Sequence, residues 1–358
     1  MQRLTHWAAL LVAALASLSA LPPVTAAHAA AGTRAVVDNT HVTYDTTGER
    51  LDAHDGMIVQ DAAGTSWLVG TSYGCGFTLG QPSPWCGVKV YRSTDLQTWT
   101  PAGAVSGLAF DPATWQARCS GDQFGCFRPH VQLRPDGTWV MWVNVAHSPH
   151  GYAVLTSPAP QGPYVEVPSP PHLAVSDSSG MPFGDQAIYR DPGSPSTAYI
   201  AYTAIGHNPS THRLVVERLD PTWTTGTGQF VVLPKTPVEA PALFRRGGLW
   251  YLTYSDPACA YCVTGTSYAT ATNPLGPWTQ RASIRAGSCG GQPAAVDVLK
   301  GAGGSLTYVY QTDRWVQPAS GQPGPVGNQA AANNYIAPLT FAASGLIPTQ
   351  ACVGTWTL

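Results

Sequence analysis

The sequence predicts an all-β fold, a five-bladed β-propeller, because one strand pattern recurs five times along the chain. Each copy alternates apolar and aromatic residues, and the copies start 72, 60, 52 and 55 residues apart: "SWLVGTSY" (66–73), "TWVMWVNV" (138–145), "AYIAYT" (198–203), "WYLTYSD" (250–256) and "SLTYVYQTD" (305–313). No helical period of useful length follows the N-terminal region. Repetition of small antiparallel sheets around an axis leaves only short sheet edges, which is the architecture of a propeller.

Turn and strand signals on either side of these segments complete each blade. A further apolar strand and a tight turn precede most copies, as in "GMIVQDAAGT", "HVQLRPDGT", "QAIYRDPGSPST" and "PALFRRGGL". Asp-Gly and Gly-Gly pairs are typical of hairpin turns. A third strand follows four copies, as "GVKVYRSTD", "GYAVLTSPA", "RLVVERLDP" and "GTSYATATN". We expect "HVTYD" (41–45) to close the ring beside the last blade; a two-sheet sandwich does not account for the repeated unit.

The N-terminal region has the pattern of a secretory signal peptide. Arg3 supplies a positive charge, residues 7–21 an apolar run, and "AHA" (27–29) a cleavage pattern of small residues. The run is too short for a membrane anchor and ends at Pro22-Pro23. We therefore expect a signal peptide over residues 1–30, a single propeller domain over residues 31–358, and a secreted protein.

Composition narrows the class of partner. Charged residues make up 11% of the chain, the net charge is −2, and the 18 Lys and Arg residues are scattered. This balance argues against nucleic-acid binding, and no later segment reaches membrane-spanning length. The oligomeric state is not readable from the sequence.

Eight cysteines suit an oxidising compartment. Their pairing does not follow from sequence alone, but closeness favours Cys75–Cys86 and Cys119–Cys126. The "CAYC" segment (259–262) has neither the βαβ context of a redox pair nor a second CxxC for zinc, so we expect a structural disulfide there.

Polar residues stand at the start of every predicted inner strand, next to the axis of the propeller. They are His54 and Asp55 in "LDAHDGMIV", Arg128 and His130 in "CFRPHVQL", Asp185 and Gln186 in "FGDQAIY", Glu239 in "VEAPALF" and Gln292 in "CGGQPAAV". Three of only 20 acidic residues fall at this repeated position. We therefore expect three carboxylates in one axial cavity.

Paired carboxyl groups on either side of a glycosidic bond are the usual apparatus of sugar hydrolysis. A third carboxylate helps to keep the acid protonated, because close carboxylates raise one another's pKa. Tyr73, Trp85 and Trp115 lie in predicted loops, where their rings could contact a sugar. The other polar residues at the strand starts are candidate substrate contacts: His54, Arg128, His130, Gln186 and Gln292.

These residues resemble those of glycoside hydrolase family 43, a family of five-bladed propellers that act on arabinose-, xylose- or galactose-containing polysaccharides. "HDGMIV" matches the motif of the general base, "GDQAIYRD" that of the residue that tunes the acid's pKa, and "VEAPALF" that of the general acid. The resemblance implies these roles for Asp55, Asp185 and Glu239 and inverting, exo-acting hydrolysis. "YRSTDLQTWT" (91–100) is similar to a further family segment, and the likeness covers essentially the whole mature chain.

Two departures from the family leave the sugar and the metal open. Phe127 stands where the exo-β-1,3-galactanase branch carries a glutamate, and that branch tends to lack the aspartate found here as Asp55. Gln292 stands where the family often has a central histidine associated with calcium or water. We assign no metal ligands and no required cofactor, and a structural, oxygen-ligated calcium stays open.

Two alternatives to this function remain at the level of the sequence. One is a glycan-binding propeller without catalysis. The other is a retaining fructosidase similar to family 32, because Asp191 in "YRDPGSP" matches that family's Arg-Asp-Pro motif. Asp-Pro-Gly between two strands is, however, first a turn signal.

Overall fold

A computed structural model describes residues 36–146, 148, 150–175, 182–206, 211–234, 238–258, 263–314 and 329–357. The expected signal peptide and the "CAYC" segment (259–262) lie outside these residues. No helix in the described ranges has the length and hydropathy needed to cross a bilayer.

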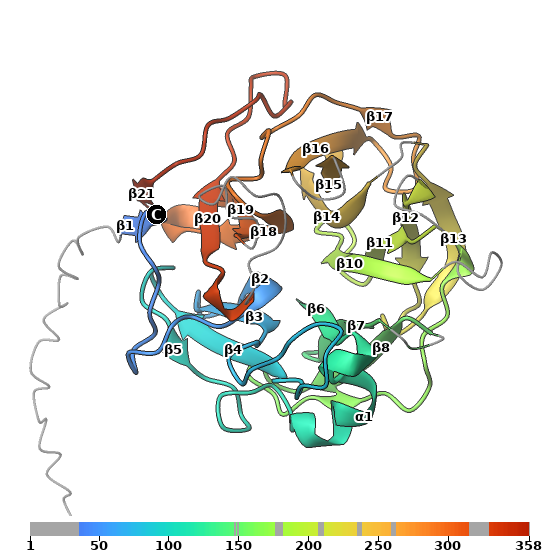
Figure 1. Cartoon of the computed structure of the whole chain (residues 1–358). Coiled ribbons are helices and arrows are strands. Elements are labelled where there is room, and N and C mark those ends of the chain that lie inside the picture. The colour runs from blue at the N-terminus through green and yellow to red at the C-terminus, as the bar shows by residue number, and fades with distance from the viewer. Residues whose placement is uncertain are drawn as a thin grey trace, which may run out of the picture. The chain divides into compact units, whose positions relative to one another are not determined.

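Five antiparallel sheets surround a central axis (Figure 1), so the predicted propeller with five blades is confirmed. Blade one contains β2 (His54–Gln60), β3 (Ser66–Thr71), β4 (Val88–Ser93) and β5 (Thr100–Pro101). Blade two contains β6 (Cys126–Leu133), β7 (Trp139–Val145), β8 (Tyr152–Ser157) and β9 (Val165–Glu166). Blade three contains β10 (Phe183–Arg190), β11 (Ala198–Ala204), β12 (Arg213–Leu219) and β13 (Gly226–Val232).

The last two blades follow the same order. Blade four contains β14 (Glu239–Arg246), β15 (Leu249–Ala258), β16 (Val263–Ala271) and β17 (Thr279–Gln280). Blade five contains β18 (Gln292–Lys300), β19 (Leu306–Asp313) and β20 (Asn334–Pro338). A four-residue helix, α1 (Gln116–Cys119), lies in the connection from blade one to blade two.

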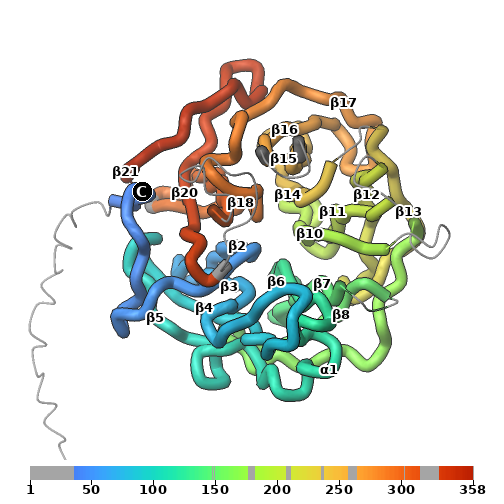
Figure 2. Tube along the Cα trace, in the orientation of Figure 1, coloured from blue at the N-terminus to red at the C-terminus, as the bar shows by residue number. Residues whose placement is uncertain are grey.

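The first strand of each blade lies innermost. In the tube view, β2, β6, β10, β14 and β18 face the axis (Figure 2), and first strands of neighbouring blades pack against one another. The predicted hairpins join these strands to the second ones; Arg246 pairs with Leu249 across the Gly247-Gly248 turn. The core lies between the blades, where apolar and aromatic side chains of adjacent sheets meet.

The predicted closing strand at 41–45 is wrong. Instead, β1 (Val36–Asp38) pairs with β21 (Thr355–Thr357), outside the blades. The place beside β19 is taken by β20, so no edge is left there for residues 41–45. That segment turns back, with Asp45 bridging to Trp99 of blade one.

Disulfides fasten two regions of the propeller. Both expected local pairs, Cys75–Cys86 and Cys119–Cys126, are confirmed. The sequence did not assign the third, Cys289–Cys352, which ties the start of blade five to the C-terminal segment.

Candidate active site

Every innermost strand carries a β-bulge close to its start. The pairing with the second strand shifts register between His54 and Met57, Phe127 and His130, Phe183 and Gln186, Glu239 and Ala242, and Pro293 and Ala295. A bulge adds a residue to one strand and re-aims its side chain. The five bulges therefore lie at one end of the axis and set the direction of the polar residues there.

Three of these bulges hold a non-glycine residue in the left-handed region. Asp55 has φ 53°, Arg128 φ 50° and Ala240 φ 53°. This conformation costs about 1–2 kcal/mol for a residue with a Cβ atom, and such outliers cluster at functional sites. Next to Asp55, the chain needs glycine: a Cβ on Gly56 would lie 1.7 Å from the carbonyl oxygen of Val69.

The three predicted catalytic carboxylates share this end of the axis. Burial raises the pKa of Asp185 to about 6; the Arg128 guanidinium opposes the shift, and the carboxylates of Glu239 and Asp55 add to it. Asp55, Asp185 and Glu239 stand at the bulged starts of β2, β10 and β14, so blades one, three and four each contribute one carboxylate to this end of the axis. One proton is readily retained within such a cluster at neutral pH.

Arg128 crosses the axis and joins three blades. Its Nε lies 2.8 Å from Asp185 Oδ1. Its other nitrogens donate to the carbonyl oxygens of Pro293 (2.9 Å) and Ala294 (3.2 Å) and to Gln292 Oε1 (3.3 Å). The guanidinium is buried, and its positive charge is paired with the Asp185 carboxylate.

Glu239 is held from two sides. Gln292 Nε2 donates to Glu239 Oε1, and His212 Nδ1 lies 3.5 Å from Glu239 Oε2. Because Gln292 also accepts from Arg128, one amide connects the carboxylate of blade four to the arginine of blade two. The glutamate is 9% exposed.

Asp55 accepts a hydrogen bond from a buried phenol. The hydroxyl of Tyr73 donates to Asp55 Oδ2 at 2.9 Å. Tyr73 comes from the β3–β4 loop, which the Cys75–Cys86 disulfide closes. The ring is only 1% exposed.

A buried charged cluster lies behind Asp55. His54 is fully buried, with Nδ1 3.1 Å from Asp313 Oδ1 and Nε2 3.3 Å from Asp52 Oδ1. Burial opposes protonation, but these two carboxylates raise the pKa of His54 to about 10. Lys89 Nζ lies 3.1 Å from Asp52 Oδ2. The imidazolium and the lysine thus balance two buried carboxylates.

Several residues predicted as substrate contacts are instead buried in the protein. Trp85 and Trp115 stack on each other with ring centroids 5.6 Å apart and are 1% and 4% exposed. Gln186 is buried and donates to the carbonyl oxygens of Arg128 and Trp142. The β3–β4 loop packs onto the segment that leads into β6, which covers the two indoles and removes them from solvent. Their prediction as sugar contacts is wrong.

His54, Tyr73, Arg128 and Gln292 do lie at the site, but they hold its carboxylates. Each makes hydrogen bonds or ion pairs to acidic residues within it. Phe127, beside Tyr73 (ring centroids 6.4 Å apart), is only partly buried and is the aromatic ring available at this edge.

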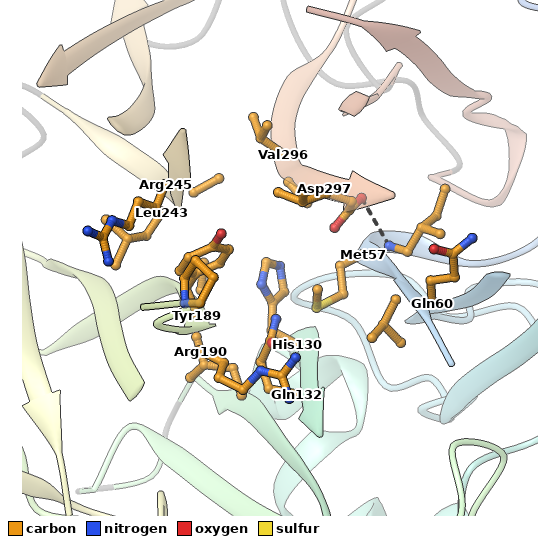
Figure 3. A pocket seen from close by; sticks show the side chains of 18 of the residues that line it. Met57, Gln60, His130, Gln132, Tyr189, Arg190, Leu243, Arg245, Val296 and Asp297 are labelled. Carbon is orange, nitrogen blue, oxygen red and sulfur yellow. Dashed lines mark hydrogen bonds between the residues drawn. The ribbon is translucent and has the colours of Figure 1, made fainter. Parts of the chain in front are cut away.

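His130 lies farther along the axis, in a cavity of about 250 Å³. Residues that follow the bulges on all five inner strands line this cavity, and Figure 3 shows the His130 ring and the Asp297 carboxyl pointing into it. His130 Nε2 and Asp297 Oδ1 have no hydrogen-bond partner in the described part of the chain. Burial and Arg128 lower the pKa of His130 to about 3, so its imidazole is neutral.

Sequence reasoning missed four residues of the site: Asp52, Lys89, His212 and Asp313. Asp52 precedes Asp55 in "LDAHD", and Asp313 ends the strand "SLTYVYQTD". Both residues therefore lie in segments that the sequence analysis had already singled out. In the structure both residues contact His54, and Asp313 is 259 residues away from His54 in the sequence. No motif singled out His212, because it approaches Glu239 from the preceding blade.

Carboxylates gathered around the axis of a five-bladed propeller define a class of protein, carbohydrate-active propellers with an axial acidic site. Residues 50–345 match the profile of glycosyl hydrolases family 43. The chain belongs to this family, as the strand and motif pattern predicted.

Individual relatives are more distant. A β-D-galactofuranosidase from Aspergillus niger is 24% identical over 191 residues, which cover 53% of this chain and 54% of the relative. This chain therefore spans about half the length of that curated relative.

Solved structures share the fold. An exo-β-1,3-galactanase from Phanerochaete chrysosporium, crystallised with β-1,3-galactotriose, gives a TM-score of 0.71 at 22% identity, over 91% of this chain and 68% of that one. An exo-β-1,3-galactanase from Clostridium thermocellum gives a TM-score of 0.69 at 22% identity, over 87% of this chain and 64% of that one.

Proposed function

We propose that the chain is a secreted, inverting, exo-acting glycoside hydrolase whose catalytic groups are Asp55, Asp185 and Glu239. The observation that carries this proposal is that three carboxylates stand at the bulged starts of the inner strands of blades one, three and four, with Arg128 and Gln292 linking Asp185 to Glu239. Disulfides in the propeller support an extracellular location.

Glu239 is the general acid in this mechanism. It protonates the oxygen of the leaving group as the glycosidic bond breaks. The Gln292 amide fixes the orientation of the carboxyl group by donating to Oε1.

Asp55 is the general base, and Asp185 supports the acid. Asp55 removes a proton from the water that attacks the anomeric carbon. Asp185 places a negative charge where it acts on Glu239. The paired Arg128 guanidinium opposes protonation of Asp185. Inversion requires the Asp55 and Glu239 carboxyl groups to stand about 6.5–9.5 Å apart, with the water between base and sugar.

Galactose-containing glycans are the proposed substrates, cleaved one sugar at a time from a chain end. The support is the names of the relatives, a galactofuranosidase and two exo-β-1,3-galactanases. β-1,3-Galactooligosaccharides are therefore the first substrate to assay, with β-galactofuranosides second.

We further propose that no calcium ion is needed beneath the carboxylates. The oxygen atoms that could bind a cation there, on Gln292, Pro293, Ala294 and Asp185, already accept from or pair with Arg128. Calcium prefers such oxygens, but the guanidinium fills the place. Among the described residues, no group of three or more His, Cys, Asp or Glu side chains is arranged so that it could hold a metal ion.

The test follows hydrolysis of β-1,3-galactotriose by NMR, with and without EDTA. We expect α-galactose as the first product, since inversion of a β-linkage gives the α-anomer, and equal rates in both buffers. Glu239→Gln and Asp55→Asn should each lower kcat by about 10²–10⁴-fold, the usual contribution of a general acid or base. Glu49→Gln, which alters an exposed carboxylate, is the control and should leave the rate unchanged.

Other outcomes would replace parts of the proposal. β-Galactose as first product would make the enzyme retaining. Binding of galactosides, furanosides included, without any turnover would make the chain a glycan-binding propeller. Full activity of Glu239→Gln would remove the glutamate from the mechanism.

A further inference from the structure

We propose that Tyr73 is a positioning residue for the base: its hydroxyl orients the Asp55 carboxylate and holds it in the ionised form. This inference rests on the proposed function, because it assigns the tyrosine a role through Asp55. The contact that carries it is the 2.9 Å hydrogen bond from Tyr73 Oη to Asp55 Oδ2.

Tyr73 is not placed to contact a sugar. The side chain is 1% exposed, and its ring packs against His54 and Phe77 at centroid distances of 5.1 and 5.4 Å. Of its polar atoms, the hydroxyl reaches Asp55. A sugar ring could stack on the partly exposed Phe127 beside it, but not on the buried face of Tyr73.

The phenol serves only as a donor to Asp55. Burial and the carboxylates of Asp55, Asp313 and Asp52 raise the pKa of Tyr73 well above its ordinary value. The hydroxyl therefore keeps its proton at neutral pH. This excludes a tyrosinate nucleophile and leaves one role, stabilisation of the negative charge on Asp55.

The tyrosine is mounted rigidly. Its backbone amide donates to Asp52 Oδ1 at 2.8 Å, and the next amide, of Gly74, donates to Asp52 Oδ2 at 3.1 Å. The hydroxyl of Ser72 also donates to Asp52, at 2.6 Å. One buried carboxylate thus fixes three consecutive residues, and the Cys75–Cys86 disulfide closes the loop just beyond them.

Asp52 is itself charge-balanced. His54 and Lys89 contact its two oxygens, and the hydrogen bonds that it accepts overcome the effect of burial and lower its pKa. Asp52 is therefore an anion throughout the working range. Its role is structural, because it anchors the backbone of the loop that carries the Tyr73 hydroxyl.

The charged groups around Asp55 determine how loss of the Tyr73 hydroxyl would affect the Asp55 carboxylate. The carboxylates of Asp185 and Asp313 act on Asp55, Asp52 and Glu239 lie in the same site, and the cations His54, Lys89 and Arg128 are each paired with one or two of these carboxylates. Removal of the Tyr73 hydroxyl takes away a donor to the Asp55 carboxylate and leaves the neighbouring carboxylates in place, so the negative charge on Asp55 is less stabilised.

The experiment compares pH profiles of kcat/KM and kcat for wild type, Tyr73→Phe and Tyr164→Phe. Tyr164 is a matched control, also buried, whose hydroxyl donates to the Pro160 carbonyl oxygen at 3.2 Å in blade two. For Tyr73→Phe, we expect the acidic limb to move up by about one pH unit and kcat to fall by about tenfold or more, since hydrogen bonds to charged groups contribute about 1.5–3 kcal/mol. KM should change by less than about twofold.

Several results would overturn the positioning role. One is an unshifted acidic limb in Tyr73→Phe. Another is a raised KM with unchanged kcat, which would make Tyr73 a substrate contact. If Tyr73→Phe fails to fold, 3-fluorotyrosine at position 73 gives the test, because this stronger donor retains the hydroxyl and should move the acidic limb down. A limb that does not move contradicts the proposal.

A double-mutant cycle separates this inference from the proposed function. If Asp55→Asn retains only a small residual rate and adding Tyr73→Phe lowers that rate no further, the tyrosine acts through Asp55. An inactive Asp55→Asn together with a Tyr73→Phe that behaves like wild type removes the positioning role alone. Full activity of Asp55→Asn instead removes the base assignment, and the positioning role with it.

Discussion

At the residue scale, Asp297 is a buried carboxyl group that the proposed mechanism does not use. Its Oδ2 accepts from the amide of Ile58 at 3.1 Å and from Gln311 Nε2. Burial raises its pKa from 3.8 to about 8, more than these hydrogen bonds can offset. The folded protein thus binds a proton at Asp297 more tightly than the unfolded chain does.

This difference predicts a pH-dependent loss of stability. Between about pH 4 and pH 8 the unfolded chain has lost the proton while the fold retains it, so the free energy of unfolding falls as pH rises. Asp297→Asn keeps the shape and removes the ionisation. We expect the variant and wild type to have similar Tm values at pH 4, and the variant to be the more stable at pH 8.

Differential scanning calorimetry across that range measures the effect. Asp136→Asn is the control, because that side chain is half-exposed and stays ionised throughout the window. A Tm difference between Asp297→Asn and wild type that does not change with pH would contradict the burial argument.

Catalytic candidates could be predicted from sequence, whereas the residues that hold them could not. Asp55, Asp185 and Glu239 occupy one repeated position, which a count of strands reveals. The partners of His54 come from 2 residues before it and from 259 residues after it, and neither pairing leaves a local pattern. Trp85, expected to contact a sugar, is buried against Trp115, which lies on another loop. The local sequence around Trp85 does not reveal that contact.

At the element scale, strands and hairpins follow from alternation and turn residues, but the bulges do not. A bulge depends on how two strands pair, and the sequence of one strand does not specify it. The one local trace is Gly56, directly after Asp55, where the chain approaches the carbonyl oxygen of Val69. This glycine is required by the bulge that aims Asp55.

Gly56→Ala should therefore damage both stability and activity. The added Cβ would lie 1.7 Å from Val69 O, so β2 and β3 must separate. We expect a loss of about 3 kcal/mol or more in the free energy of unfolding, at or above the usual cost of overpacking, and a lower kcat in the folded fraction.

Gly248→Ala is the matched control for urea denaturation. A Cβ there meets no atom within 4 Å and the residue has no left-handed φ. Its effect should stay within about 0.5 kcal/mol. Equal stability of Gly56→Ala and wild type would show that the bulge can relax.

At the scale of the whole molecule, the number of blades could be predicted but the closure of the ring could not. Blade number is a count of repeats, and repeats are visible in sequence. Closure depends on which distant segments meet, and residues 41–45, expected beside the last blade, bridge to Trp99 of blade one instead. The first and last described strands pair instead as β1 and β21, supported by Trp356, whose Nε1 donates to Ile336 O at 2.6 Å.

The Cys289–Cys352 disulfide is the covalent part of this closure. It closes a loop of 63 residues, whereas Cys119–Cys126 closes one of 7. In the chain-entropy account, the longer loop stabilises the fold more, by about 4 kcal/mol against about 2.4 kcal/mol. Replacement of each pair by serines should therefore lower the guanidinium midpoint more for Cys289/Cys352. The reverse order would mean that native packing around the Cys119–Cys126 loop, rather than entropy of the unfolded chain, decides what a disulfide contributes to this propeller.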